Sequence, residues 1–179
     1  MRLKNTSKAY GSIAKFFHWT IFVLLLGMII YGFLLDDIPK PYQSFNYNLH
    51  KLIGILILFL MLARLWWLIR DPKPKKVGPK WEKWLESFVH YSLYVVVIAM
   101  PLSGCIGSLA GGHPPHLGNV NLMLPVAKDN ALDEAAFDVH GTLAYLIIAL
   151  VSVHALAALF HHFIRKDDVL RRMLPNSGA

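Results

Sequence analysis

The sequence predicts an all-α membrane protein, a bundle of four transmembrane helices that forms one domain over residues 1–179. Hydrophobic residues make up 55% of the chain and charged residues only 16%, whereas a soluble domain carries about 25% charged residues. Four apolar runs each reach the roughly 20 residues that a helix needs to cross a bilayer. The expected spans cover residues 14–35, 48–70, 84–110 and 136–165, which leaves no room for a separate soluble domain.

The net charge of +7 is distributed unevenly along the chain. Basic residues gather before the first span, between the second and third, and after the fourth, whereas acidic residues dominate the other two connections. The positive-inside rule therefore places both termini and the middle connection in the cytoplasm. Basic cytoplasmic flanks account for the positive charge without a nucleic-acid partner. The single cysteine, Cys105, excludes an intrachain disulfide and a cysteine-ligated cluster.

The first two spans each carry a histidine near one end. His18 lies one turn into the first span beside Trp19, and a plain interfacial histidine is the alternative interpretation. A short outer connection, Asp36 to Asn48, leads to His50 at the start of the second span. Arg64 follows on the same helix face, ~21 Å closer to the cytoplasm. A buried arginine needs an anion, which a haem propionate would supply; snorkelling to the nearby interface is the alternative.

The third span carries one histidine, and a long connection follows the span. His90 lies one turn into it, at about the depth of His18. The outer connection from Gly111 to Phe137 is the longest non-spanning segment and contains His113 and His116. A long outer loop often covers a functional site, although proline and glycine also simply make turns.

The fourth span carries four histidines within a run, Val139 to Ile164, that has no formal charge. His140 and His154 are fourteen positions apart, which puts them ~21 Å apart along a helix and within ~40° of the same face. His161 stays within ~20° of His154, whereas His162 points about 100° away. Histidine inside a membrane span is costly without a partner, so this helix face is the leading candidate for a functional site.

The histidines separate into two depths, with His50 and His140 outside and His18 and His154 inside. Two axial nitrogens from facing helices are what a six-coordinate haem b requires, and a filled coordination sphere favours electron transfer over oxygen binding. Helix bundles commonly hold cofactors in this way. Spacing does not decide between His18 and His90 as the inner partner of His154. A set of purely structural histidines is the alternative.

Several short motifs occur in a fixed order along the chain. They are Phe17-His18-Trp19, Leu49-His50-Lys51-Leu52-Ile53-Gly54, Met61-Leu62-Ala63-Arg64-Leu65, Met100-Pro101-Leu102-Ser103-Gly104, Val139-His140-Gly141, His154 with His161-His162, and Lys166-Asp167-Asp168 followed by Arg171-Arg172-Met173-Leu174-Pro175. Each motif alone is weak, but the ordered set resembles the bacterial cytochrome b561 family over nearly the whole chain.

The resemblance implies a protein of the bacterial inner membrane with two b haems. The inner haem would be held by His18 and His154, and the outer haem by His50 and His140. The choice of His18 over His90 follows from the analogy and not from the spacing.

The four-span members of this family are similar to a superoxide oxidase, which passes electrons from superoxide to ubiquinone. The resemblance therefore implies an oxidoreductase that accepts electrons at the outer surface and reduces ubiquinone near the inner haem, with His161 as a quinone neighbour. Lys51, together with Lys40, would attract the superoxide anion.

Two other functions stay open at this point. The chain could be the membrane cytochrome b subunit of a larger dehydrogenase or hydrogenase, which a co-purifying redox partner subunit would reveal. It could also be a non-redox carrier whose histidines bind zinc or copper. In every case membrane lipid is the surrounding partner.

Overall fold

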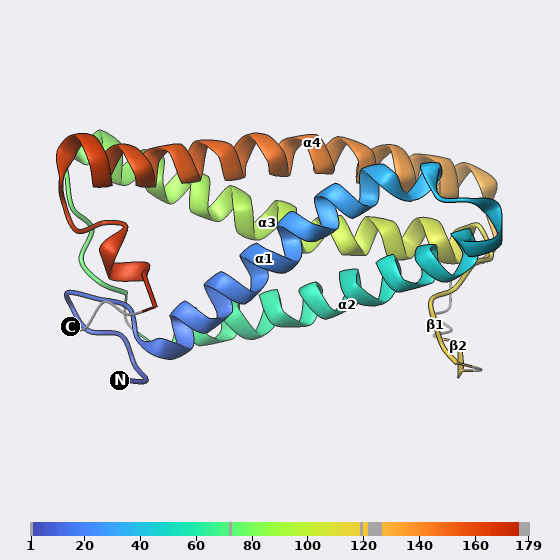
Figure 1. Cartoon of the computed structure of the whole chain (residues 1–179), viewed down its shortest axis with the longest axis horizontal. Coiled ribbons are helices and arrows are strands. Elements are labelled where there is room, and N and C mark those ends of the chain that lie inside the picture. Colours follow the sequence, from blue (N-terminus) through green and yellow to red (C-terminus); the bar gives the residue numbers. More distant parts are fainter. Residues whose placement is uncertain (1, 72, 119, 122–126, 176–179) are drawn as a thin grey trace.

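A computed structural model describes residues 2–71, 73–118, 120, 121 and 127–175. Four long helices run antiparallel in chain order, and they are α1 (Ser12–Leu34), α2 (Lys40–Arg70), α3 (Lys80–Ala110) and α4 (Asn130–Phe160). Both termini lie at one end of the bundle, called here the terminal end (Figure 1). The opposite end, called the hairpin end, carries the antiparallel strands β1 (His116–Leu117) and β2 (Val120–Asn121). The prediction of a four-helix, all-α protein is confirmed.

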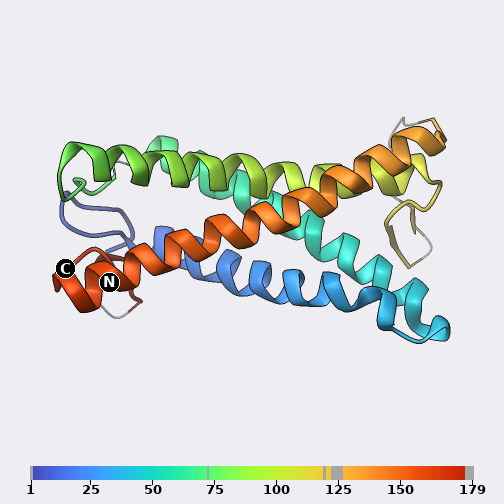
Figure 2. The same cartoon turned by 90° about the horizontal axis from the view of Figure 1, so that it is seen from above.

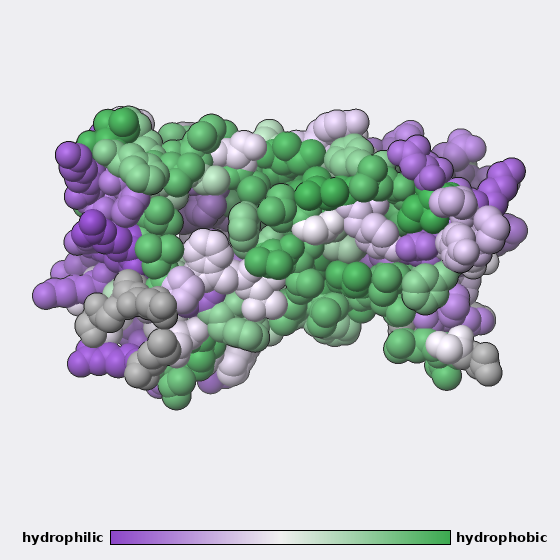
Figure 3. All heavy atoms as spheres, viewed as in Figure 1, coloured by the Kyte–Doolittle hydropathy of each residue, from purple (hydrophilic) through white to green (hydrophobic). Residues whose placement is uncertain are grey.

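The surface of the bundle is that of a multi-pass membrane protein. All four helices are long and apolar enough to cross a membrane. Large apolar side chains such as Phe59 and Val95, which are 64% and 67% exposed, face outward from the middle of the bundle. Figure 3 shows this apolar band between two hydrophilic ends. A helix suits such a setting because it satisfies its own backbone hydrogen bonds in lipid.

The helices start earlier than the sequence predicted. The expected connection over residues 36–48 is a 3₁₀ turn, Leu35–Asp37, and α2 already begins at Lys40. Pro41 did not prevent this start, because proline lacks only an amide that the first helical turn leaves unpaired. The loop expected over residues 111–137 is also shorter. Asp129 caps α4, since its side chain accepts hydrogen bonds from the amides of Ala131 and Leu132.

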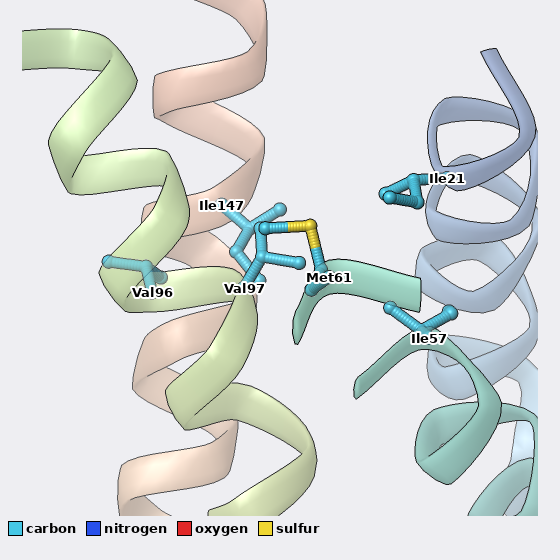
Figure 4. Packing of buried hydrophobic residues seen from close by; sticks show 6 residues of the cluster. All are labelled: Ile21, Ile57, Met61, Val96, Val97 and Ile147. Atoms are coloured by element: carbon cyan, nitrogen blue, oxygen red, sulfur yellow. The ribbon is translucent and has the colours of Figure 1, made fainter. Parts of the chain in front are cut away.

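An apolar core layer occupies the middle of the bundle (Figure 4). Its buried members are Ile21, Ile57, Met61, Val96, Val97 and Ile147. Ile147, only 1% exposed, is seven residues from both His140 and His154 on α4. The layer therefore separates two levels at which histidines lie.

Polar contacts close the terminal end. The amide of Asn5 donates to the buried carboxylate of Asp71 at 2.8 Å. The indole of Trp19 donates to the carbonyl of Met173 at 2.9 Å, so the C-terminal segment is tied to α1 one residue after His18. These bonds hold the segments before α1 and after α4 against the end of the bundle.

Candidate functional site

At the hairpin end, His50 of α2 and His140 of α4 face each other. Their ring centroids are 6.2 Å apart, and the ring planes make an angle of 68°. Nδ1 of His140 lies 3.0 Å from the carbonyl oxygen of Met100. Since a carbonyl only accepts, this nitrogen carries the proton and Nε2 has a free lone pair. The hydroxyl of Ser103 lies 3.2 Å from the same Nδ1.

Two glycines let the backbone approach this hairpin-end pair. A Cβ at Gly104 would come within 2.9 Å of Cε1 of His140, and one at Gly32 within 3.2 Å of Cε1 of His50. The ring of His50 is also enclosed, because its Nδ1 is buried without a hydrogen-bond partner among the described residues. The pair is therefore seated in a close-fitting cradle.

At the terminal end, His18 of α1 and His154 of α4 form the second pair. Their ring centroids are 6.1 Å apart, at an angle of 61°. His90 of α3 is a third histidine at this level, with its ring only 5.1 Å from that of His154. Nη2 of Arg64 lies 3.2 Å from Nδ1 of His18, and its guanidinium stands 5.5 Å over the ring of Tyr94. Arg64 thus points to the histidine level.

The ring separations distinguish the histidine pairs chemically. Two imidazoles that bind one metal from opposite sides, each through a nitrogen at about 2.0–2.1 Å, have centroids about 6 Å apart. The pairs at 6.2 and 6.1 Å match this distance, whereas His90 and His154, at 5.1 Å, are too close. The residues present therefore fit a bis-histidine haem at each level. No group of three or more His, Cys, Asp or Glu in the described part of the chain is arranged to hold a metal ion.

His161 lies beyond the second pair, where α4 changes into a π-helical turn, His161–Arg165. Its Nδ1 is 2.5 Å from a carboxylate oxygen of Asp167. Burial alone would raise the pKa of Asp167, but the hydrogen bonds from His161 and the Val169 amide hold that pKa below its usual value. The carboxylate is therefore ionised, and His161 donates from Nδ1.

Sequence reasoning missed the contact between His161 and Asp167. Residues six apart do not share a helix face. Lys166, between them in the chain, has φ of 56°, the left-handed conformation that reverses the backbone. A non-glycine residue in that conformation is not foreseen from sequence, so no signal identified the pair.

The predicted anion-attracting residue, Lys51, contacts the outer loop. Its ammonium donates to the carbonyl of His113 at 2.7 Å. Asn48, one helical turn earlier, both donates to the carbonyl of His116 and accepts from its amide, at 2.8 and 2.9 Å. The loop is therefore fastened to α2 two to three turns after its start, and the contacts of His113 and His116 seen here are structural.

Four membrane helices and two levels of facing histidines define a class of protein: a helical membrane protein built to hold cofactors in its interior. The sequence model of prokaryotic cytochrome b561 matches residues 9–176. The chain therefore belongs to the prokaryotic cytochrome b561 family, whose proteins are haem-binding membrane electron carriers.

Curated relatives support the assignment over the full length. Cytochrome b561 homolog 2 of Escherichia coli (strain K12) is 32% identical over 187 residues, which cover 100% of this chain and 98% of that protein. The probable superoxide oxidase CybB of Yersinia pestis is 31% identical over 189 residues, covering 94% of this chain and 97% of that protein. Cytochrome b561 homolog 1 of Escherichia coli (strain K12) is 32% identical over 130 residues, covering 70% of this chain and 73% of that protein.

Proposed function

We propose that the chain holds two b haems and carries electrons from superoxide at the hairpin end to ubiquinone at the terminal end. The observation that carries the proposal is the pair of ring separations, 6.2 and 6.1 Å, at two levels of one bundle. The charge distribution supports a cytoplasmic terminal end in a bacterial inner membrane. A relative named as a probable superoxide oxidase supports the choice of donor.

When bound, each haem supplies a one-electron couple with no open iron position. At the hairpin end, His50 and His140 would hold the haem iron. The bond from Nδ1 of His140 to the Met100 carbonyl fixes the orientation of the ring and leaves the lone pair of Nε2 free. The close approach of Gly104 keeps this ring from turning.

At the terminal end, His18 and His154 would be the ligands. Because arginine only donates, Nδ1 of His18 accepts from Arg64, and its proton sits on Nε2. To hold a haem iron through Nε2, His18 would have to carry its proton on Nδ1, and Arg64 would then contact another, anionic partner. A haem propionate is such a partner, so this contact supports Arg64 as a cofactor-binding residue.

Reduction of a quinone needs protons as well as electrons. Two superoxide anions, one ubiquinone and two protons give two dioxygen molecules and one ubiquinol. His161, held by Asp167 at Nδ1, would present Nε2 to the quinone and exchange protons with it. At the other end, the ammonium of Lys51 contributes local positive charge for the superoxide anion.

The proposal is tested on the purified chain by a reduced-minus-oxidised spectrum and a pyridine assay of haem per polypeptide. We expect two low-spin b haems, and rapid reduction of both by superoxide followed by reoxidation with ubiquinone. His161→Ala should keep both haems and slow the reoxidation. A preparation without haem, despite adequate haem supply, would refute the proposal. Reduction that requires a co-purifying protein would assign the chain to a larger dehydrogenase or hydrogenase.

A further inference from the structure

A hollow on the lipid-facing side of the bundle lies between α3 and α4. It has a volume of about 700 Å³, in the range of small-molecule sites. Its lining includes Trp84, Ser87, Phe88 and Tyr91 from α3, and Leu146 and Leu150 from α4. The two helices diverge towards the terminal end (Figure 2). Trp84 and Tyr91 are 67% and 64% exposed, so the hollow opens sideways towards lipid.

One end of this groove lies level with His161. Between α3 and α4, Arg165 pairs with Glu82 at 2.5 Å, and the ring of His154 lies 5.1 Å from that of His90. His161 falls between these two contacts, and so does Trp84 on α3. His161 opens the π-helical turn that continues α4 and is eleven residues after Leu150, which places it within ~20° of the same face.

The groove has a polar end and an apolar end, which follow each other along the membrane normal. Near the terminal end it contains the hydroxyl of Ser87, which contacts the ammonium of Lys76. Towards the middle of the bundle it continues past Ser92 to Val95 and Val96, and Val96 belongs to the apolar core. An occupant would therefore have a polar head at the membrane surface and an apolar chain directed towards the bilayer centre.

The stacked rings of Trp84 and Phe88, with centroids 5.6 Å apart and planes at 11°, form a flat wall on one side. Such a wall suits a branched, unsaturated chain that offers flat segments. Phospholipid has the same polarity, but nothing in its chemistry requires the neighbourhood of His161 and His154. A quinone does require it, because its ring must exchange protons and electrons there.

We propose that the groove between α3 and α4 is the binding site for the isoprenoid tail of a quinone whose ring lies beside His161. The inference rests on the proposed function and adds the route by which the quinone enters from the membrane. The tail lies along α3 from Trp84 to Val95, and the ring reaches His161 between the diverging helix ends.

The direct test uses a ubiquinone analogue with a diazirine in its tail, photolysed with the haem-loaded protein in phospholipid nanodiscs. We expect labelling on residues 84–95, displaced by unlabelled ubiquinone. Val95→Trp fills the groove and should reduce the labelling about tenfold. Val23→Trp is the matched control, since Val23 and Val95 each follow a terminal-level histidine by five residues and are 63% and 67% exposed.

Labelling spread over all four helices would overturn the proposal. Equal labelling of residues 84–95 by a phospholipid with a diazirine in its acyl chain would assign the groove to lipid instead. In Val95→Trp, the visible absorption spectrum of the haems and the circular-dichroism spectrum of the helices should be unchanged. Ser92→Phe serves as a second variant that fills the groove.

A kinetic comparison separates this inference from the proposed function. Val95→Trp should raise the KM for a long-tail ubiquinone about tenfold and leave that for a short-tail ubiquinone unchanged. Equal effects on both quinones, or none on the long-tail one, contradict a tail site. If the unaltered protein reduces no quinone but is still labelled specifically at residues 84–95, the proposed function is wrong, whereas the groove is still a binding site for the quinone tail.

Discussion

The hairpin-end and terminal-end histidine pairs have almost the same ring separation but different surroundings. At the hairpin end, His140 is held by a neutral carbonyl, and its Nε2 is already free to bind a metal. At the terminal end, His18 accepts from a cationic guanidinium, and a third histidine crowds His154. In the proposed two-haem protein, the hairpin-end pair is therefore preorganised for its cofactor, whereas the terminal-end pair would have to rearrange a proton and an arginine.

This difference assigns separate tasks to the two levels. The close-fitting cradle fixes the geometry of the hairpin-end pair, and the ammonium of Lys51 beside it donates to the loop carbonyl of His113 rather than to a histidine ring. A nearby cation stabilises the reduced state of an iron centre, since reduction removes one positive charge. In the proposed two-haem protein, Arg64 would therefore raise the reduction potential of the terminal-end haem relative to the hairpin-end haem, which would favour electron flow towards the terminal end.

The largest expected effect comes from removing one ligand of each pair. His140→Ala should remove the hairpin-end haem alone and His154→Ala the terminal-end haem alone, so each lowers the haem content from two per chain to about one. His90→Ala is the control, because its 5.1 Å separation from His154 is too short for a shared iron. Loss of a haem in His90→Ala, with retention in His18→Ala, would reverse our choice of ligand.

A smaller effect should follow from closing the cradle of the hairpin-end pair. Gly104→Ala places a methyl group 2.9 Å from Cε1 of His140, and relieving such overpacking costs about 1–3 kcal/mol. We expect partial loss of the hairpin-end haem in the pyridine assay. Gly141→Ala, where a Cβ meets nothing within 4 Å, should retain full haem content. Equal loss in both variants would mean that the cradle does not seat the ring.

The sequence predicted the two histidine levels of the bundle but not the different surroundings of the two pairs. Apolar run lengths and the fourteen-residue spacing follow helix geometry, so they foretold four helices and two histidine levels. The start of α2 at Lys40 was not predicted, because a proline in the first turn of a helix is also typical of a loop. The partners of Arg64 and Asp167 depend on how separate segments pack, and one-dimensional spacing carries no information on that.

The cation at the terminal-end pair can be removed without changing the ligands. Arg64→Gln should lower the midpoint potential of the terminal-end haem by about 60 mV, a tenfold change for a one-electron couple, and leave the hairpin-end haem unaltered. Redox titration followed at the haem absorption bands measures both values. Arg70→Gln is the matched control, because Arg70 lies on the same helix but over the ring of Trp66 at the exposed end. A similar shift in both variants would show that general surface charge sets the potential.

The smallest effect concerns the proton partner that accompanies the terminal-end pair. Asp167→Asn removes the charge opposite Nδ1 of His161 but keeps a hydrogen-bonding side chain, so ubiquinone reduction should slow a few-fold, with both haems retained. Asp168→Asn is the control, since that exposed carboxylate contacts only Arg171 in the described structure, at 3.7 Å. Equal slowing in both variants would mean that Asp167 acts through surface charge rather than by orienting His161.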